Sequence, residues 1–201
     1  MSSHMSYIKL ARLDKPIGIY LLLWPSLLGL MLGAVNEGYV DFENYLIVLA
    51  GAILVRSCGC VINDISDYKF DKLVKRTKDR PIASGEIGLK EAWIFFIILA
   101  IASLSLLLLT PPITIKLALF FSLLILFYPL AKRFIRAPQI ILGITFGSGS
   151  IISYSLQSDS FSISLVVLYI GLIAWIVSCL LYTSDAADDT PCVDLGGRRI
   201  I

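Results

Sequence analysis

The chain has 201 residues, of which 57% are apolar and 16% charged, and its mean hydropathy is +0.84. A soluble domain of this length is far more polar, so the composition indicates a membrane protein. The formal net charge is only +2, and we expect a lipid bilayer around the chain and no nucleic-acid partner. The single histidine, His4, argues against a histidine-based metal site or catalytic triad.

Six apolar segments are long enough, or nearly long enough, to cross a bilayer as helices. They cover about residues 17–35, 44–62, 93–110, 113–130, 139–155 and 163–182. Residues 1–5 look like a cloning remnant or a misassigned start, and the basic, amphipathic residues 6–16 suit an entry helix on the membrane surface. The fold predicted from this pattern is all-α, a multi-pass transmembrane helix bundle.

Lysine and arginine residues alternate between the ends of these segments. They occur before the first span, between the second and third spans, and between the fourth and fifth spans, whereas residues 36–43, 110–112 and 156–162 contain none. Under the positive-inside rule, this alternation places the N terminus and the two basic loops in the cytoplasm. It also supports the count of six spans.

The second span runs directly into a polar segment, residues 63–71, that carries three aspartates. Asp64, Asp67 and Asp71 are spaced i, i+3 and i+7, so they share one face of a helix. Clustered carboxylates suit Mg²⁺, which prefers oxygen ligands and keeps open positions for phosphate oxygens. The cations that follow suit the charge of a diphosphate: Lys72, Lys75, Arg76, Lys78 and Arg80. The segment predicts a Mg²⁺-diphosphate site at the mouth of a membrane protein; a solvated helix end with positive-inside cations is the alternative.

The remaining features favour packing rather than chemistry. Gly143 and Gly147 lie four residues apart in the fifth span, as in close helix–helix contacts. The cysteines are not spaced as a zinc site, so we interpret them as apolar packing residues. Residues 183–201 are polar and aperiodic, and we expect them to be a non-native tail; a genuine short polar tail is the alternative.

Several stretches, in order along the chain, resemble the UbiA superfamily of intramembrane prenyltransferases, and within it the enzymes that act on 4-hydroxybenzoate. They are RLDKPIG at 12–18, LLLWP at 21–25, NDxxDxxxD at 63–71, RPIASG at 80–85 and YPLAKR at 128–133. The resemblance covers residues 6 to about 178. We therefore expect residues 6–182 to form an incomplete UbiA-type domain with six of the nine helices of that fold.

The resemblance implies transfer of a polyprenyl group from polyprenyl diphosphate to the ring of 4-hydroxybenzoate in ubiquinone biosynthesis, with Mg²⁺ as cofactor, at the cell inner membrane. Asp64, Asp67 and Asp71 would hold the metal, with Asn63 supporting them. The residues implied for the diphosphate are Arg76, Lys78 and Arg80. Arg133 and Lys132 would bind the acceptor carboxylate, and Arg56 inside the second span is either a further substrate contact or part of a structural ion pair.

One departure from the family pattern bears on activity. The family carries a second aspartate motif after the sixth helix, and Leu180 stands where its first aspartate belongs. We therefore expect the 201-residue chain to be inactive on its own. Two other functions stay open at this point: a polyisoprenoid-phosphate binding or transport protein without transferase chemistry, and a UbiA-type enzyme that uses another aromatic acceptor.

Overall fold

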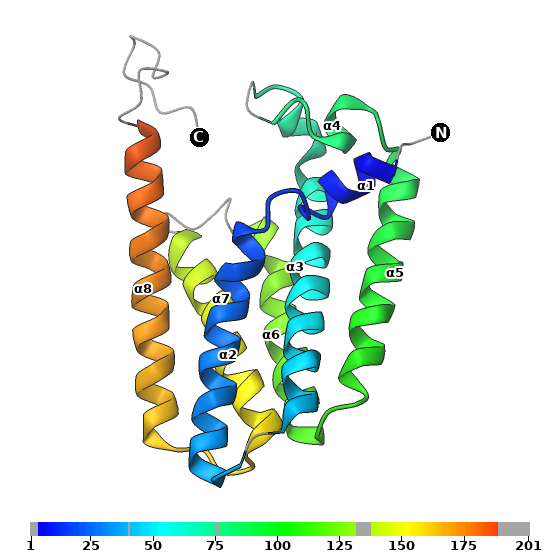
Figure 1. Cartoon of the computed structure of the whole chain (residues 1–201). Helices are drawn as coiled ribbons and strands as arrows, with labels where there is room; N and C mark the ends of the chain where they lie inside the picture. The colour runs from blue at the N-terminus through cyan, green and yellow to red at the C-terminus, as the bar shows by residue number, and fades with distance from the viewer. Residues whose placement is uncertain (1–3, 40, 75–76, 132–137, 189–201) are drawn as a thin grey trace.

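The computed structural model describes residues 4–39, 41–74, 77–131 and 138–188. These residues form eight helices joined by turns, with no strand in the described ranges. Two of the helices are short, α1 (His4–Leu10) and α4 (Pro81–Ser84), and both lie at the same end of the molecule (Figure 1). The predicted all-α fold class is confirmed.

Six long helices form the bundle, and each runs antiparallel to the long helix before it in the chain (Figure 1). They are α2 (Ile17–Glu37), α3 (Phe42–Asp71), α5 (Leu89–Leu107), α6 (Pro112–Ala131), α7 (Pro138–Gln157) and α8 (Ile163–Asp188). Five of them are long and apolar enough to cross a membrane, and the segment Pro112–Leu126 of α6 is a shorter apolar helix. Large apolar side chains cover their outer faces, so the chain is a multi-pass membrane protein.

Turn chemistry sets where these helices begin and end. Gly38 follows α2 with a left-handed φ of 76°, and its N–H donates to the Ala34 carbonyl at 2.9 Å. A residue with a Cβ is strained in that conformation, which makes glycine the natural helix stop. The Asp41 side chain then caps α3 by accepting from the Glu43 N–H at 3.1 Å. The α3 helix continues well past its apolar part, so residues 63–71 are helical as predicted.

Small residues let α7 lie close to two neighbouring helices. A Cβ added at Gly29 of α2 would lie 2.6 Å from the Cα of Ser150 on α7. On α8, the Val177 Cγ2 atom would lie 2.7 Å from a Cβ at Gly143. Such distances are far below van der Waals contact, so glycine is needed for these close crossings. The packing role predicted for Gly143 agrees with this geometry.

An apolar cap covers the end of α3 that carries the aspartates. Its buried members come from α1, α3, α5 and the segment around α4: Leu10, Val61, Ile65, Ile82, Ile87 and Ala92. Because Leu10 and Ile82 are anchored in this cap, the residues next to them are fixed as well. Those neighbours include Arg12 and Arg80, whose side chains reach the site.

Candidate functional site

Two arginines and two aspartates form a connected ion-pair cluster at the capped end of α3. Arg12 Nη2 lies 3.2 Å from both carboxylate oxygens of Asp64. Arg80 Nη1 lies 3.1 Å from Asp64 Oδ1 and 2.8 Å from Asp71 Oδ2, so one nitrogen joins the two aspartates. The Asp64 side chain is only 2% exposed, whereas the two arginine side chains are 25% and 22% exposed. The carboxylates are therefore buried, whereas the guanidinium groups that pair with them are partly exposed.

Arg12 reaches this cluster from an uncommon backbone conformation. Its φ is 59°, and within the described ranges it alone combines a positive φ with a side chain. Such a conformation costs about 1–3 kcal/mol for a residue other than glycine. The burial of Leu10 and Ala11 just before it and the paired Asp64 carboxylate offset that cost. This left-handed backbone conformation directs the Arg12 guanidinium toward Asp64 of α3.

A cavity of about 860 Å³ opens beside the cluster. Arg12, Asn63, Asp64 and Arg80 line its polar end. Its other walls are mainly apolar and come from α2, α3, α6, α7 and α8, with Leu21, Trp24, Val55, Ile125, Leu142 and Trp175 among them. This combination of one charged end and a long apolar wall suits an amphiphile with an anionic head.

Arg56 lies on the same cavity, two turns deeper along α3 than Asp64. Its Nε atom is buried and has no hydrogen-bond partner among the residues that the structure describes. The guanidinium carbon lies 5.5 Å from the centre of the Phe146 ring, and the first turn of α2 passes so close that a Cβ on Gly18 would lie 2.6 Å from Nη2. Leaving a buried donor without a partner costs free energy. An anion that accepts a hydrogen bond from Arg56 would remove this cost, so Arg56 favours the binding of an anion.

The structure places most of the predicted site residues. Asp64, Asp67 and Asp71 are all buried on α3, but only Asp64 and Asn63 line the cavity. Arg80 and Arg56 line it too, whereas Lys78 is exposed and does not. The predictions for Arg76, Lys132 and Arg133 fall outside the described residues. In the part of the chain that the structure describes, no three carboxyl, thiol or imidazole groups lie close enough together to hold a metal ion.

Arg12 lines the cavity, although the sequence analysis assigns it no role in the site. It directly follows the apolar pair Leu10 and Ala11, and that pair is the signal of a buried turn that could have indicated its position. Leu180 of α8 lines the cavity. The position expected to carry the first aspartate of a second motif therefore does face the site, with a leucine in place of the carboxylate.

Comparison with known proteins places this geometry in a family. The model of the UbiA prenyltransferase family matches residues 22–191. The 4-hydroxybenzoate octaprenyltransferase of Saccharophagus degradans is 41% identical over 174 residues, which make up 87% of this chain and 58% of that protein. The enzyme of the same name from Pseudomonas aeruginosa (strain LESB58) is 40% identical over 185 residues, 91% of this chain and 62% of that protein. The chain thus spans less than two thirds of these relatives.

Solved structures share the fold. A digeranylgeranylglyceryl phosphate synthase matches with a TM-score of 0.74 and 24% identity, over 94% of this chain and 66% of that one. A UbiA homologue from Archaeoglobus fulgidus bound to GPP and Mg²⁺ matches with a TM-score of 0.71 and 19% identity, over 89% of this chain and 62% of that one. At these identities the likeness concerns the helix arrangement.

Proposed function

The chain belongs to the UbiA prenyltransferase family, and from that premise we propose that its site serves the Mg²⁺-dependent transfer of a polyprenyl group from polyprenyl diphosphate to the ring of 4-hydroxybenzoate. The observation that carries the proposal is the cavity of about 860 Å³ with its charged cluster at one end and its apolar walls. The names of the relatives supply the substrates. We place the reaction at the cytoplasmic face of the cell inner membrane, where the basic loops belong under the positive-inside rule.

The carboxylates at the charged end have the chemistry that Mg²⁺ requires. Asp64 Oδ1 and Asp71 Oδ2 both lie within 3.1 Å of one nitrogen of Arg80. Two hard oxygens that already share one cation suit a divalent ion in its place. When bound there, Mg²⁺ neutralises charge on the diphosphate and makes it a better leaving group.

The two arginines of the cluster supply the hydrogen-bond donors at the charged end of the cavity. Arg12 and Arg80 hold partly exposed guanidinium groups at the cavity, where they can donate to phosphate oxygens. Both are positioned by the apolar cap rather than by flexible loops. Charge developing on the departing diphosphate therefore meets donors that are already in place.

The acceptor needs a binding group deeper in the cavity, and Arg56 provides one. Eight residues of α3 separate it from Asp64, which corresponds to about 12 Å along the helix. A carboxylate on Arg56 would leave the aromatic ring between the two charged groups, beside Gly59 and Cys60 of the cavity wall. Its buried Nε has no hydrogen-bond partner within the described part of the chain, so Arg56 has a donor that a carboxylate can satisfy.

With the diphosphate at the charged end and the acceptor ring beside it, the proposed prenyl transfer exchanges one bond for another. The bond between the allylic carbon and the diphosphate oxygen breaks, and its electron pair leaves with the diphosphate. The ring carbon ortho to the phenolic oxygen forms a new bond to the allylic carbon, and the proton on that ring carbon is then released to restore aromaticity. The apolar walls keep water away from the allylic carbon during this exchange.

The test uses an extended chain, defined as residues 1–178 continued by the C-terminal segment of the Pseudomonas aeruginosa relative. This chain should prenylate 4-hydroxybenzoate, and Asp64→Asn should lower turnover by about 100-fold or more. The matched control is Asp79→Asn, an exposed aspartate of the cationic loop, which should leave turnover within about twofold of the parent because surface changes have small effects. Equal turnover in the two variants would contradict the assignment.

The same experiment separates the competing functions. Binding of polyprenyl diphosphate by the extended chain without transfer to any aromatic acid would favour a binding or transport protein. Transfer to a different aromatic acid would retain the enzyme class and replace the acceptor. We expect no turnover from residues 1–201 alone, because Leu180 lines the α8 wall of the cavity at the position where the resemblance places the first aspartate of a second motif.

A further inference from the structure

The guanidinium of Arg56 lies over an aromatic ring on the wall of the cavity of about 860 Å³. Its Cζ atom is 5.5 Å from the centre of the Phe146 ring, which belongs to α7. Phe146 is half-buried and lines this cavity together with Arg56. A cation within about 6 Å of a ring centre is attracted by the electron-rich face of the ring, most strongly where water is excluded. Phe146 is thus placed to act on Arg56.

The ring contact leaves the hydrogen-bond donors of Arg56 available. A ring face attracts the charge of a guanidinium without occupying its N–H groups, and Nε has no hydrogen-bond partner among the described residues. The ring can therefore hold the side chain in place while its donors remain free to bind an anion. A Cβ on Gly18 would lie 2.6 Å from Nη2, so the first turn of α2 limits how far the guanidinium can move. Attraction from α7 and contact with α2 together define its position.

Helical periodicity directs Phe146 toward the cavity. A Cβ added at Gly147 would lie 3.2 Å from the Tyr169 ring of α8, so this side of α7 faces α8. A Cβ added at Gly149 would overlap the Ser26 hydroxyl, so that side of α7 faces α2. Successive helical residues turn by about 100°, which places residue 146 between these two sides. Both α2 and α8 contribute walls to the cavity, and the Phe146 ring lines the space between them.

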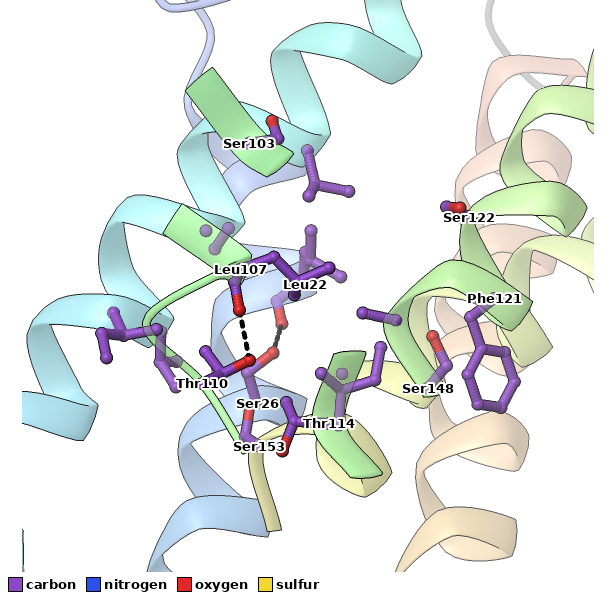
Figure 2. A pocket seen from close by; sticks show the side chains of 18 of the residues that line it. Leu22, Ser26, Ser103, Leu107, Thr110, Thr114, Phe121, Ser122, Ser148 and Ser153 are labelled. Atoms are coloured by element: carbon purple, nitrogen blue, oxygen red, sulfur yellow. Dashed lines mark hydrogen bonds between the residues drawn. The ribbon is translucent and has the colours of Figure 1, made fainter. Parts of the chain in front are cut away.

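Hydrogen bonds at both sides of α7 accompany these close contacts. On the α2 side, the Ser26 hydroxyl donates to the Leu22 carbonyl at 2.8 Å, and Figure 2 shows this bond at the edge of a smaller cavity of about 140 Å³. On the α8 side, the Tyr169 hydroxyl donates to the Ile144 carbonyl at 3.1 Å. Closely packed helices with satisfied hydroxyls do not shift freely. The backbone of Phe146 is therefore fixed by the bundle, and its ring is a firm support for Arg56.

We propose that Phe146 is a positioning residue for the aromatic acceptor, because it holds the Arg56 guanidinium at the point where the acceptor carboxylate binds. This inference rests on the proposed function, since it assumes an anionic acceptor at Arg56. The ring acts through the cation, so its loss should weaken the binding of an aromatic carboxylate. The binding of prenyl diphosphate and of a neutral aromatic analogue should change much less, because neither relies on the charge of Arg56.

The test compares variants of Phe146 in the extended chain. Phe146→Leu keeps an apolar side chain beside Arg56 but removes the ring face. The KM for 4-hydroxybenzoate should rise roughly tenfold, whereas the KM for polyprenyl diphosphate and the inhibition constant of neutral 4-hydroxybenzamide should stay within about twofold. Phe146→Tyr retains the ring face, so its KM for 4-hydroxybenzoate should lie within about twofold of the parent value.

The matched control removes a ring from the outer face of the bundle. Phe120 of α6 is 60% exposed, and Phe120→Leu should leave all three constants unchanged. The inference is overturned, and the proposed function left intact, by an unchanged KM for 4-hydroxybenzoate in Phe146→Leu or by an equal rise in KM for both substrates. A Phe146→Tyr variant that behaves as Phe146→Leu has the same meaning. If the parent extended chain transfers no prenyl group, the proposed function falls and the inference falls with it.

A second measurement needs no turnover. Binding of 4-hydroxybenzoate, at one fixed concentration in detergent, should raise the unfolding temperature of the extended chain. We expect a smaller rise in Phe146→Leu and the full rise in Phe146→Tyr and Phe120→Leu. An equal rise in Phe146→Leu and in the parent would refute the role given to the ring. A parent chain whose unfolding temperature does not respond would contradict the acceptor site at Arg56, and the inference with it.

Discussion

The contact between Gly18 and Arg56 gives a sharp test of the acceptor site. In Gly18→Ala, the new methyl carbon would lie 2.6 Å from Arg56 Nη2 and 2.7 Å from its Cζ. Favourable contacts need about 3.5–4.0 Å, so the guanidinium must retreat by about 1 Å. Because it is the far end of a flexible side chain, it can do so without moving either helix.

The expected consequence is kinetic rather than structural. A misplacement of about 1 Å in a binding group can cost about 100-fold in rate, and we expect that loss in kcat/KM for 4-hydroxybenzoate. The KM for polyprenyl diphosphate should stay within about twofold, since the aspartates and Arg80 are not displaced. Thermal stability should not fall, because alanine is about 1 kcal/mol better than glycine inside a helix.

The assay measures initial rates with each substrate varied in turn, in the extended chain and in its Gly18→Ala variant, with thermal unfolding in detergent as the companion measurement. Gly171→Ala is the control, since its Cβ would meet nothing within 4 Å. An unchanged kcat/KM for the acceptor would refute the role given to Arg56. So would an equal rise in KM for both substrates, because that would indicate a general distortion of the cavity.

Three further predictions use other parts of the molecule. Gly29→Ala should destabilise the chain by about 1–3 kcal/mol in thermal unfolding, because the added carbon would overlap the Ser150 backbone; an unchanged midpoint would contradict the close α2–α7 crossing. A thiol reagent that cannot cross the membrane should label Asp159→Cys but not Ser84→Cys in intact cells, since both positions are exposed at opposite ends of the bundle; the reverse result would invert the topology. In Arg80→Met, added Mg²⁺ should raise the unfolding temperature more than in the parent, because two carboxylates lose the cation that they share; an equal or smaller shift would argue against a metal site there.

The helices were predictable because their causes are local. An apolar run of about 20 residues must form a helix in a bilayer, where each backbone group needs a partner within the segment. Pro112 and Pro138 are the first residues of α6 and α7, and Gly38 follows the last residue of α2, as backbone chemistry alone favours. The three aspartates share a buried face of α3 for the same reason, since helical periodicity fixes their relative directions.

The contacts between distant segments were not predictable in this way. Arg12 and Asp64 are 52 positions apart, and their pairing depends on an apolar cap assembled from four separate segments. The sequence placed Arg80 with the phosphate-binding cations, whereas the structure shows it between Asp64 and Asp71. The cavity beside the ion-pair cluster has no signature in the sequence either, because it is a space that side chains of five long helices leave unfilled.

The ion-pair cluster constrains how the proposed ligands can bind. Arg12 and Arg80 neutralise Asp64 and Asp71 in the structure, so the cluster has no surplus charge to attract either ligand alone. Mg²⁺ entering by itself would have to displace Arg80 and leave a guanidinium without its anion, which is costly at a partly buried site. A diphosphate entering by itself would draw the arginines away and leave two carboxylates facing each other. When both ligands enter together, the carboxylates take the metal and the arginines take the phosphate oxygens, so every charge keeps an opposite partner. If the proposed function holds, the cluster therefore favours the joint binding of metal and diphosphate over the binding of either one.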